Sequence, residues 1–197
     1  TDQALASTSL KHAAVYTISV RIAQSGEAGY NSNYTYSGGS FDYTINRFSV
    51  SINTGNITLP SNVVFDGTSY QFNPNRTTAD TSKLYGYTAY SQLVSALKTV
   101  DKSVGYKWNL AAGAQTGSYY NAGTYSVTIN GITNNTDGYN DYVLAQNVTL
   151  TWTIQQKILD VTATTKNHTY QRTLGQSANS YSFDIKISGL VTSGSGY

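Results

Sequence analysis

Apolar and polar residues alternate along most of the chain, and this period of two predicts β-strands. The alternating segments combine β-branched, aromatic and hydroxyl side chains, and they cover 15–20, 48–52, 124–129, 148–154, 158–163 and 181–187. Such segments are typical of sheets with one buried face and one face in water. Clusters of Gly and Asn, such as Gly38-Gly39 and Asn53-Thr54-Gly55, separate the segments and predict turns.

One segment has a helical period instead. Between Ala89 and Asp101 the apolar residues lie on one face of a 3.6-residue helix, at Ala89, Leu93, Val94, Leu97 and Val100. Thr88 is the expected N-cap, and Gly105 lies just beyond the expected end. The chain is therefore predicted to be α+β and mainly β, with one amphipathic helix over 89–101. An immunoglobulin-like β-sandwich, which has no need of this helix, is the alternative fold.

The chain also repeats itself at a constant interval, the one that separates Ala13 from Ala122. This one shift superimposes four pairs of segments without a gap: 13–16 on 122–125, 29–31 on 138–140, 43–45 on 152–154, and Val50 and Ile52 on Leu159 and Val161. Residues 65–68 match 170–173 at a slightly shorter interval. We interpret this as one module copied head to tail.

The repeat interval divides the chain into one complete unit and two halves. Residues 47–155 form the complete unit, residues 1–46 the C-terminal half of a preceding repeat, and residues 156–197 the N-terminal half of a following repeat. A half-unit exposes unpaired strand edges, so the two chain ends are expected to be the weakest parts of the structure.

Short motifs within the repeat resemble the MBG/YDG-type repeats of bacterial cell-surface adhesins. The matching segments are Ala122-Gly-Thr-Tyr125, Tyr139-Asn-Asp-Tyr142, Leu150-Thr-Trp-Thr-Ile154, Leu159-Asp-Val-Thr-Ala163 and Phe65-Asp-Gly-Thr68. The last of these has Phe where the YDG signature has Tyr, and 170–173 has lost its Gly. The first copy of the AGTY motif reads Ala13-Ala-Val-Tyr16.

The resemblance implies ubiquitin-like β-grasp units and a role in large adhesins of lactobacilli and related mucus-binding proteins. In such a unit, residues 48–72 would form a hairpin, 89–101 the helix, and 106–112, 124–130 and 148–155 three strands. From the residues themselves, Gly123 allows a tight entry to a strand, and Tyr125 is expected to pack at the edge of the core.

Composition excludes several functions. Twelve Lys and Arg against ten Asp and Glu, without a basic run, are too few for nucleic-acid binding. The absence of Cys excludes disulfides and thiolate zinc sites. Apolar runs as short as Val63-Val64-Phe65 predict no membrane insertion. One Glu, nine Asp and two His, without a catalytic motif, predict that the chain is not an enzyme and has no cofactor.

Calcium is one open possibility. In the oxygen-rich segment 134–141, the side chains of Asp137, Asn140 and Asp141 could join backbone carbonyls around Ca²⁺. The alternative is a simple turn, in which Asn and Asp bond to their own backbone.

Tyrosine is the residue type that the sequence favours for ligand binding. Six tyrosines cluster before the expected helix and before the AGTY strand: Tyr85, Tyr87, Tyr90, Tyr106, Tyr119 and Tyr120. Tyrosine can stack on sugar rings and offer its hydroxyl, but half-buried strand tyrosines are the alternative.

These observations predict a non-catalytic repeat or stalk segment of a bacterial adhesin, located outside the cell and anchored to the cell wall in the full-length protein. Its expected partners are host glycans, mucin or extracellular matrix protein, and the neighbouring repeats of the same chain. A structural spacer without a ligand and an accessory module of an extracellular carbohydrate-active enzyme are the alternatives.

Overall fold

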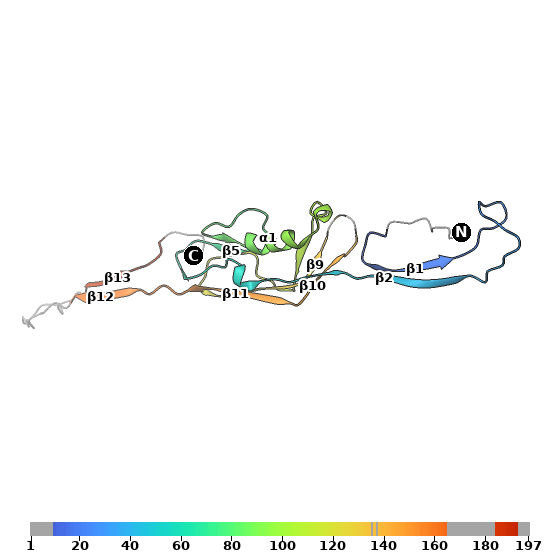
Figure 1. Cartoon of the computed structure of the whole chain (residues 1–197). Helices are drawn as coiled ribbons and strands as arrows, with labels where there is room; N and C mark the ends of the chain where they lie inside the picture. The colour runs from blue at the N-terminus through green and yellow to red at the C-terminus, as the bar shows by residue number, and fades with distance from the viewer. Residues whose placement is uncertain (1–9, 135, 137, 165–183, 193–197) are drawn as a thin grey trace, which may run out of the picture.

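The computed structural model describes residues 10–134, 136, 138–164 and 184–192. A central body is flanked at opposite ends by two thin hairpins, β1–β2 and β12–β13 (Figure 1). The strands are β1 (Ala14–Val20), β2 (Gly39–Ile45), β3 (Phe48–Val50), β4 (Val63–Val64), β5 (Tyr70–Phe72), β6 (Leu84–Tyr85), β7 (Lys107–Leu110), β8 (Ser118–Tyr119), β9 (Gly123–Thr133), β10 (Tyr142–Leu144), β11 (Val148–Gln155), β12 (Asp160–Thr164) and β13 (Asp184–Ser188). The helices are α1 (Tyr87–Ala96) and the 3₁₀ turns η1 (Thr54–Asn56) and η2 (Thr99–Asp101). The prediction of a mainly β chain with one α-helix is confirmed for the described residues.

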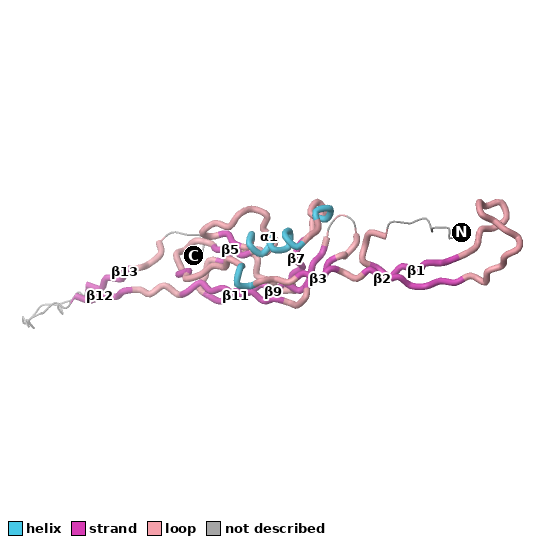
Figure 2. The backbone as a smooth tube through the Cα atoms, viewed as in Figure 1, coloured by secondary structure: helices cyan, strands magenta, loops and turns pink. Residues whose placement is uncertain are grey.

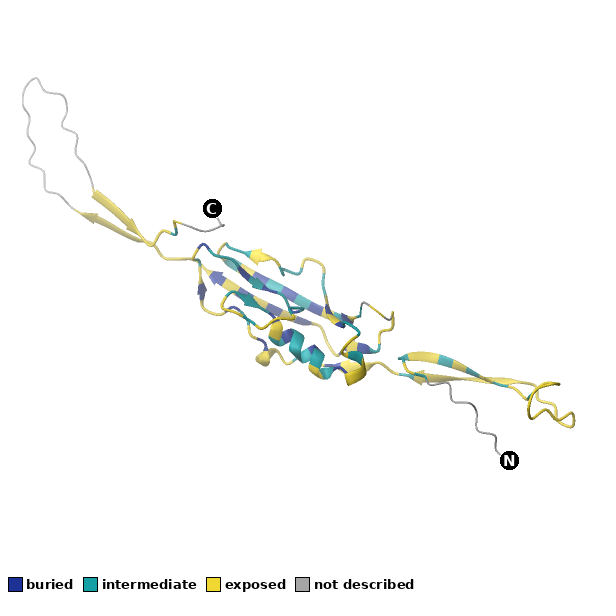
Figure 3. Ribbon diagram, turned by 90° about the horizontal axis from the view of Figure 1, so that it is seen from above, coloured by how far each residue is buried: buried dark blue, intermediate teal, exposed yellow. Residues whose placement is uncertain are grey.

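A four-stranded sheet in the order β4-β11-β9-β7 forms the centre of the body. β9 and β11 alternate as the sequence predicts, and their inward side chains are all buried: Tyr125, Val127, Ile129, Val148, Leu150, Trp152 and Ile154. The outward positions carry hydroxyl residues, and Thr128 and Thr149 share a hydrogen bond of 2.8 Å across the strands. Figure 3 shows this alternation of buried and exposed residues along the central strands.

Helix α1 supplies the other side of the core. Ala89 and Leu93 are fully buried in the same apolar cluster as the inward residues of β9 and β11. The indole Nε1 of Trp108, on β7, donates a 2.9 Å hydrogen bond to the carbonyl oxygen of Ala89, which ties the helix to the sheet. The predicted apolar stripe therefore faces the core, as an amphipathic helix requires.

The helix boundaries differ from the prediction of 89–101. α1 starts at Tyr87, whose N–H donates to the Asp80 carboxylate at 2.8 Å, so Asp80 performs the capping role expected of Thr88. The hydroxyl of Thr88 instead accepts a hydrogen bond from Thr58 N. The helix ends at Ala96, and Val100 is 78% exposed beyond it. Leu97 is extended because the Lys98 N–H is held by the hydroxyl of Tyr142 at 3.0 Å.

The expected hairpin over 48–72 is wrong. β3 pairs parallel with β10, and β4 pairs parallel with β11, so neither strand pairs with the other. Between them, Gln92 of α1 ties the chain to the helix through two hydrogen bonds with the backbone of Asn53, of 2.8 and 3.0 Å. β5 forms a separate small sheet with β6 and β8.

The N-terminal hairpin has the same strand register as the centre of the body. β1 and β2 pair antiparallel from Ala14↔Ile45 to Val20↔Gly39, and β9 and β11 pair from Gly123↔Ile154 to Ile129↔Val148. Every one of these pairs is related to its counterpart by the repeat interval seen in the sequence. The repeat is thus present in the backbone pairing as well as in the sequence.

The β1–β2 hairpin and the β9–β11 pair differ in how far their side chains are buried. Leu150 and Trp152 are 3% and 2% exposed, whereas their counterparts Phe41 and Tyr43 are 54% and 50% exposed. β2 therefore presents to water the side chains whose counterparts on β11 face the core (Figure 3). On β1, the counterparts of the buried β9 residues, Tyr16, Ile18 and Val20, are half-buried. No described element covers that face in the way that α1 covers the central sheet.

The C-terminal hairpin has no such counterpart. β12 pairs antiparallel with β13, from Asp160↔Ser188 to Thr164↔Asp184. The segment that lies one repeat interval before β12, 51–55, is not a strand and includes the start of η1 in the central body. Val161, Ile185 and Ile187 are exposed on the hairpin. Residues 160–164 thus have a different structure from residues 51–55, which lie one repeat interval earlier.

Gly86 allows a stability test with a matched control. Gly86 has φ +121°, and a Cβ there would overlap the backbone carbonyl of Asn73, whereas Gly105 has φ +83° and open space around it. Gly105→Ala should lower the free energy of unfolding by about 1–2 kcal/mol, the cost of a left-handed conformation. Gly86→Ala adds a backbone overlap and should cost about 3 kcal/mol or more. Urea denaturation measures both, and equal losses would contradict the packing around Gly86.

Candidate functional site

The AGTY tyrosines make the same hydrogen bond in both copies. Tyr125 donates its hydroxyl to the carbonyl oxygen of Asn121 at 2.6 Å, and Tyr16 donates to that of His12 at 2.8 Å. Each acceptor lies four residues before its tyrosine. The ring of Tyr125 also stacks on Trp152, with 4.6 Å between centroids, and burial raises the pKa of its hydroxyl. This tyrosine fixes the start of the strand.

The YDG-like segment forms a polar turn. The carboxylate of Asp66 accepts hydrogen bonds from the N–H and hydroxyl of Thr68, at 2.9 and 2.6 Å, and from the hydroxyl of Tyr70 at 3.1 Å. Lys83 Nζ lies 3.7 Å from the same carboxylate, and Gly67 has φ +75°. Burial opposes ionisation, but the hydrogen bonds and Lys83 hold the pKa of Asp66 below its ordinary value. The hydrogen bonds of this carboxylate hold the turn that leads into β5, and Lys83 links it to the segment just before β6.

The base of the N-terminal hairpin is attached to the central body through Asp141. One carboxylate oxygen of Asp141 lies 2.8 Å from His12 Nδ1, and the other accepts the Ala13 N–H at 2.6 Å. The His12 ring stacks on Tyr139, with 3.6 Å between centroids and 2° between planes. A pocket of about 520 Å³ lies at this junction, and its lining includes Phe48 and Tyr142.

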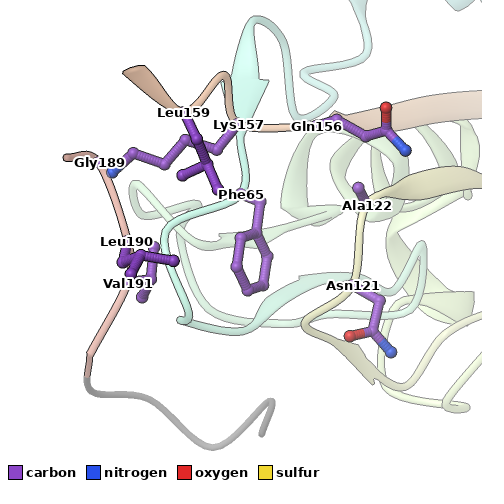
Figure 4. Close-up of a pocket in the computed structure, with 9 residues that line it drawn as sticks. All are labelled: Phe65, Asn121, Ala122, Gln156, Lys157, Leu159, Gly189, Leu190 and Val191. Carbon is purple, nitrogen blue, oxygen red and sulfur yellow. The ribbon is translucent and has the colours of Figure 1, made fainter. Parts of the chain in front are cut away.

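A second pocket, of about 440 Å³, lies where the central body meets the C-terminal hairpin (Figure 4). Its lining residues are Phe65, Asn121, Ala122, Gln156, Lys157, Leu159, Gly189, Leu190 and Val191. In Figure 4 the Phe65 ring projects into the space between Leu190 and Asn121.

The two pockets are related by the repeat. The repeat interval carries His12, Ala13 and Phe48 of the first pocket onto Asn121, Ala122 and Lys157 of the second. The two pockets therefore lie at positions related by the repeat interval, one at each end of the central body. Apolar side chains and backbone dominate the second pocket, and a single Lys supplies its charge, so its lining holds no acid–base pair for chemistry.

The predicted tyrosines lie in different environments. Tyr106 is 2% exposed and packs edge-on against Tyr142, and Tyr119 packs against Tyr125 with 4.3 Å between centroids. Tyr85, Tyr90 and Tyr120 are half-buried, while Tyr87 on α1 is exposed. The six belong to several elements of the body and do not form one continuous exposed face.

Sequence reasoning missed other exposed tyrosines. Tyr30, Tyr34 and Tyr36 lie in the loop that joins β1 to β2, and all three are exposed. Their signal was present in the sequence, because Gly and Asn surround them and predict a loop rather than a strand. It also missed the contact of His12 with Asp141, which joins residues 129 positions apart.

The calcium prediction falls partly outside the described residues, because Asp137 is not among them. Asn140 is exposed, and both carboxylate oxygens of Asp141 contact the base of the N-terminal hairpin. Within the described part of the chain, no group of three His, Cys, Asp or Glu side chains is placed to hold a metal ion. Calcium binding stays a prediction.

Comparison with known proteins finds no match: no family model, no curated protein and no solved structure is similar to this chain. None of the helices in the described ranges is both long and apolar enough to span a membrane.

The raised pKa of Tyr142 predicts that the folded state loses stability at alkaline pH. Burial and the hydrogen bond that its hydroxyl donates to Asp101 raise the pKa of Tyr142 to about 12. Because the pKa is raised in the folded state, the stabilisation is complete below about pH 10, the ordinary tyrosine value, and is lost as the pH rises to 12. Two pKa units correspond to roughly 2–3 kcal/mol.

Tyr142→Phe should therefore flatten the fall in unfolding free energy between pH 10 and pH 12, which urea titration at each pH measures. At pH 8 the variant should be about 1 kcal/mol less stable, because the Lys98 N–H and Asp101 lose their partner. An unchanged slope above pH 10 would contradict the role assigned to this hydroxyl.

Proposed function

We propose that this chain is a non-catalytic repeat segment of a bacterial cell-surface adhesin, built from MBG/YDG-type units that extend the protein away from the cell wall. The observation that carries the proposal is the shared register of β1–β2 and β9–β11, related throughout by the repeat interval. Two hairpins of identical pairing and similar sequence within one chain are the pattern of a tandem repeat.

The exposed face of β1–β2 supports this division. Its aromatic residues, including Phe41 and Tyr43, have counterparts that are buried under α1 in the central unit. Residues 1–46 are then the C-terminal half of a preceding repeat, whose N-terminal half would cover this face. Residues 47–155 are one complete unit, and 156–197 begin the next.

The architecture of the central unit supports a ubiquitin-like β-grasp. Such a fold needs a mixed sheet, one helix packed on it, and a first strand parallel to the last. The central unit has one helix over the sheet, and β4 runs parallel to β11. An immunoglobulin-like sandwich is less well supported, because it consists of two antiparallel sheets without a packed helix.

The linear arrangement supports the role of a stalk. The hairpins lie at opposite ends of the central body, so successive units follow one another along one direction (Figure 2). Host glycans, mucin or matrix protein would bind weakly through exposed tyrosines, and tandem units would multiply such weak contacts. The burial of Tyr106 and the half-burial of four other predicted tyrosines favour the second candidate, a spacer without a ligand.

A hybrid unit tests the repeat directly. Residues 47–118 fused ahead of Leu10 keep the repeat interval, so the added segment can complete a unit with β1–β2. We expect the amide hydrogens of β1 and β2 to exchange much more slowly in the fusion, because their apolar face gains a cover.

The matched control is the same fusion with Leu93→Asp in the added copy, which places a charge in the core beneath the helix. Protection should then return to the level of the unmodified chain. Equal exchange rates in β1–β2 with and without the added segment would contradict the proposed unit boundaries.

A binding measurement distinguishes the adhesin proposal from the spacer proposal. The adhesin proposal predicts measurable binding of the unmodified chain to a mucin surface or a glycan array, weakened by Tyr87→Ala. Ser95→Ala, also exposed on α1, is the control and should bind as the unmodified chain does. Absence of binding in every format would leave the spacer as the function.

A further inference from the structure

The first and last segments of the central unit run parallel and are joined at two places. At the first place, Phe48 N–H donates to the Asp141 carbonyl and Ala145 N–H to that of Val50, both at 2.8 Å. At the second, Phe65 N–H donates to the Gln155 carbonyl at 2.9 Å, next to the pairing of β4 with β11.

This parallel pairing places the entry and exit of the unit at opposite ends. The chain enters beside β10 at Phe48 and leaves beside β4 at Gln155. Figure 1 shows the neighbouring hairpins leading away in opposite directions from these two points. Tension along the chain therefore pulls the first segment past the last. Because strand-to-strand hydrogen bonds lie across this direction, the bonds at each contact are loaded together in shear.

The terminal hairpins respond differently to the same tension. In β1–β2 the strand ends Ala14 and Ile45 are directly paired, as are Asp160 and Ser188 in β12–β13. Pulling such neighbouring ends apart loads one pair at a time, so each hairpin opens in sequence from its base. Under tension, the two terminal hairpins therefore open one pair at a time, whereas the contacts of the central unit are loaded together in shear.

We infer that the central unit is a mechanical clamp that holds its fold under tension along the chain. One face of each contact lies in the core, where Val50, Val63, Leu144 and Ile154 are buried, while Phe48 and Val64 on the other face are exposed. Gln92 adds a tie between the first segment and α1 through its two hydrogen bonds to Asn53. Resistance to tension needs no ligand, and it goes beyond the proposed role as a repeat segment.

Single-molecule pulling on the full chain tests the clamp by its direction dependence. Because the chain has no Cys, Arg47→Cys with Gln156→Cys provides unique handles at the entry and exit of the unit. Unfolding should release roughly 35 nm of contour length, as 48–155 is drawn out.

Asn130→Cys with Asn147→Cys is the control pair, because it peels β9 from β11 at Ile129↔Val148. The clamp predicts a clearly higher unfolding force for the first pair, and equal forces would overturn it.

Proline variants test the bonds themselves. Phe48→Pro removes the N–H that donates to Asp141, while Phe48→Ala removes the ring and keeps that bond. Under tension on the first handles, Phe48→Pro should unfold about fivefold faster than Phe48→Ala, as expected for one hydrogen bond.

Ala111→Pro removes a bond of the same kind outside the clamp, from Ala111 N–H to Thr128 at 2.9 Å. It should lower stability in urea without a comparable loss of resistance to tension. If Ala111→Pro weakens the unit under tension as much as Phe48→Pro, the clamp is wrong. This outcome leaves the repeat proposal untouched, because the hybrid unit tests that separately.

Discussion

The apolar face of β9 and β11 is the constraint on which the described structure depends. Burying one large apolar side chain is worth roughly 1.5–3 kcal/mol, and eight side chains of these two strands, Ile132 included, are buried together. That burial requires α1 on the opposite side, with Leu93 fully enclosed between helix and sheet. The hairpin β1–β2 has the same pairing without the cover, and an isolated two-stranded hairpin is marginally stable in water.

The sequence predicted the parts of the fold that depend on local periodicity. Alternation located β9 and β11, and the apolar stripe located α1, because both patterns report which side of an element meets the core. The parallel pairing of β3 with β10 was not predictable in this way. It joins Phe48 to Tyr142 across most of the unit, and alternation does not specify a strand's partner. Val100 continued the helical pattern, but Lys98 bonds to Tyr142 and the helix ends before it.

The candidate sites were harder to predict than the fold. The tyrosines were chosen because they cluster in the sequence, yet Tyr106 is a core residue and Tyr87 lies on the helix surface. The attachment of His12 to Asp141 joins two segments that are far apart in the sequence, which no local pattern encodes. The AGTY tyrosine was predictable as structural, and its bond to the carbonyl four residues earlier, present in both copies, gives the physical reason.

The pairing of two strands and the burial of their apolar face are therefore separate steps in building this protein. In a repeat array, the adjoining segment would bury that face. Amide hydrogen exchange of the unmodified chain, followed residue by residue by NMR, tests this claim most directly. The account predicts strong protection along β9 and β11 and weak protection along β1 and β2, although the two hairpins share one register. Equal protection of the two hairpins would show that pairing alone provides the stability, and would contradict the account.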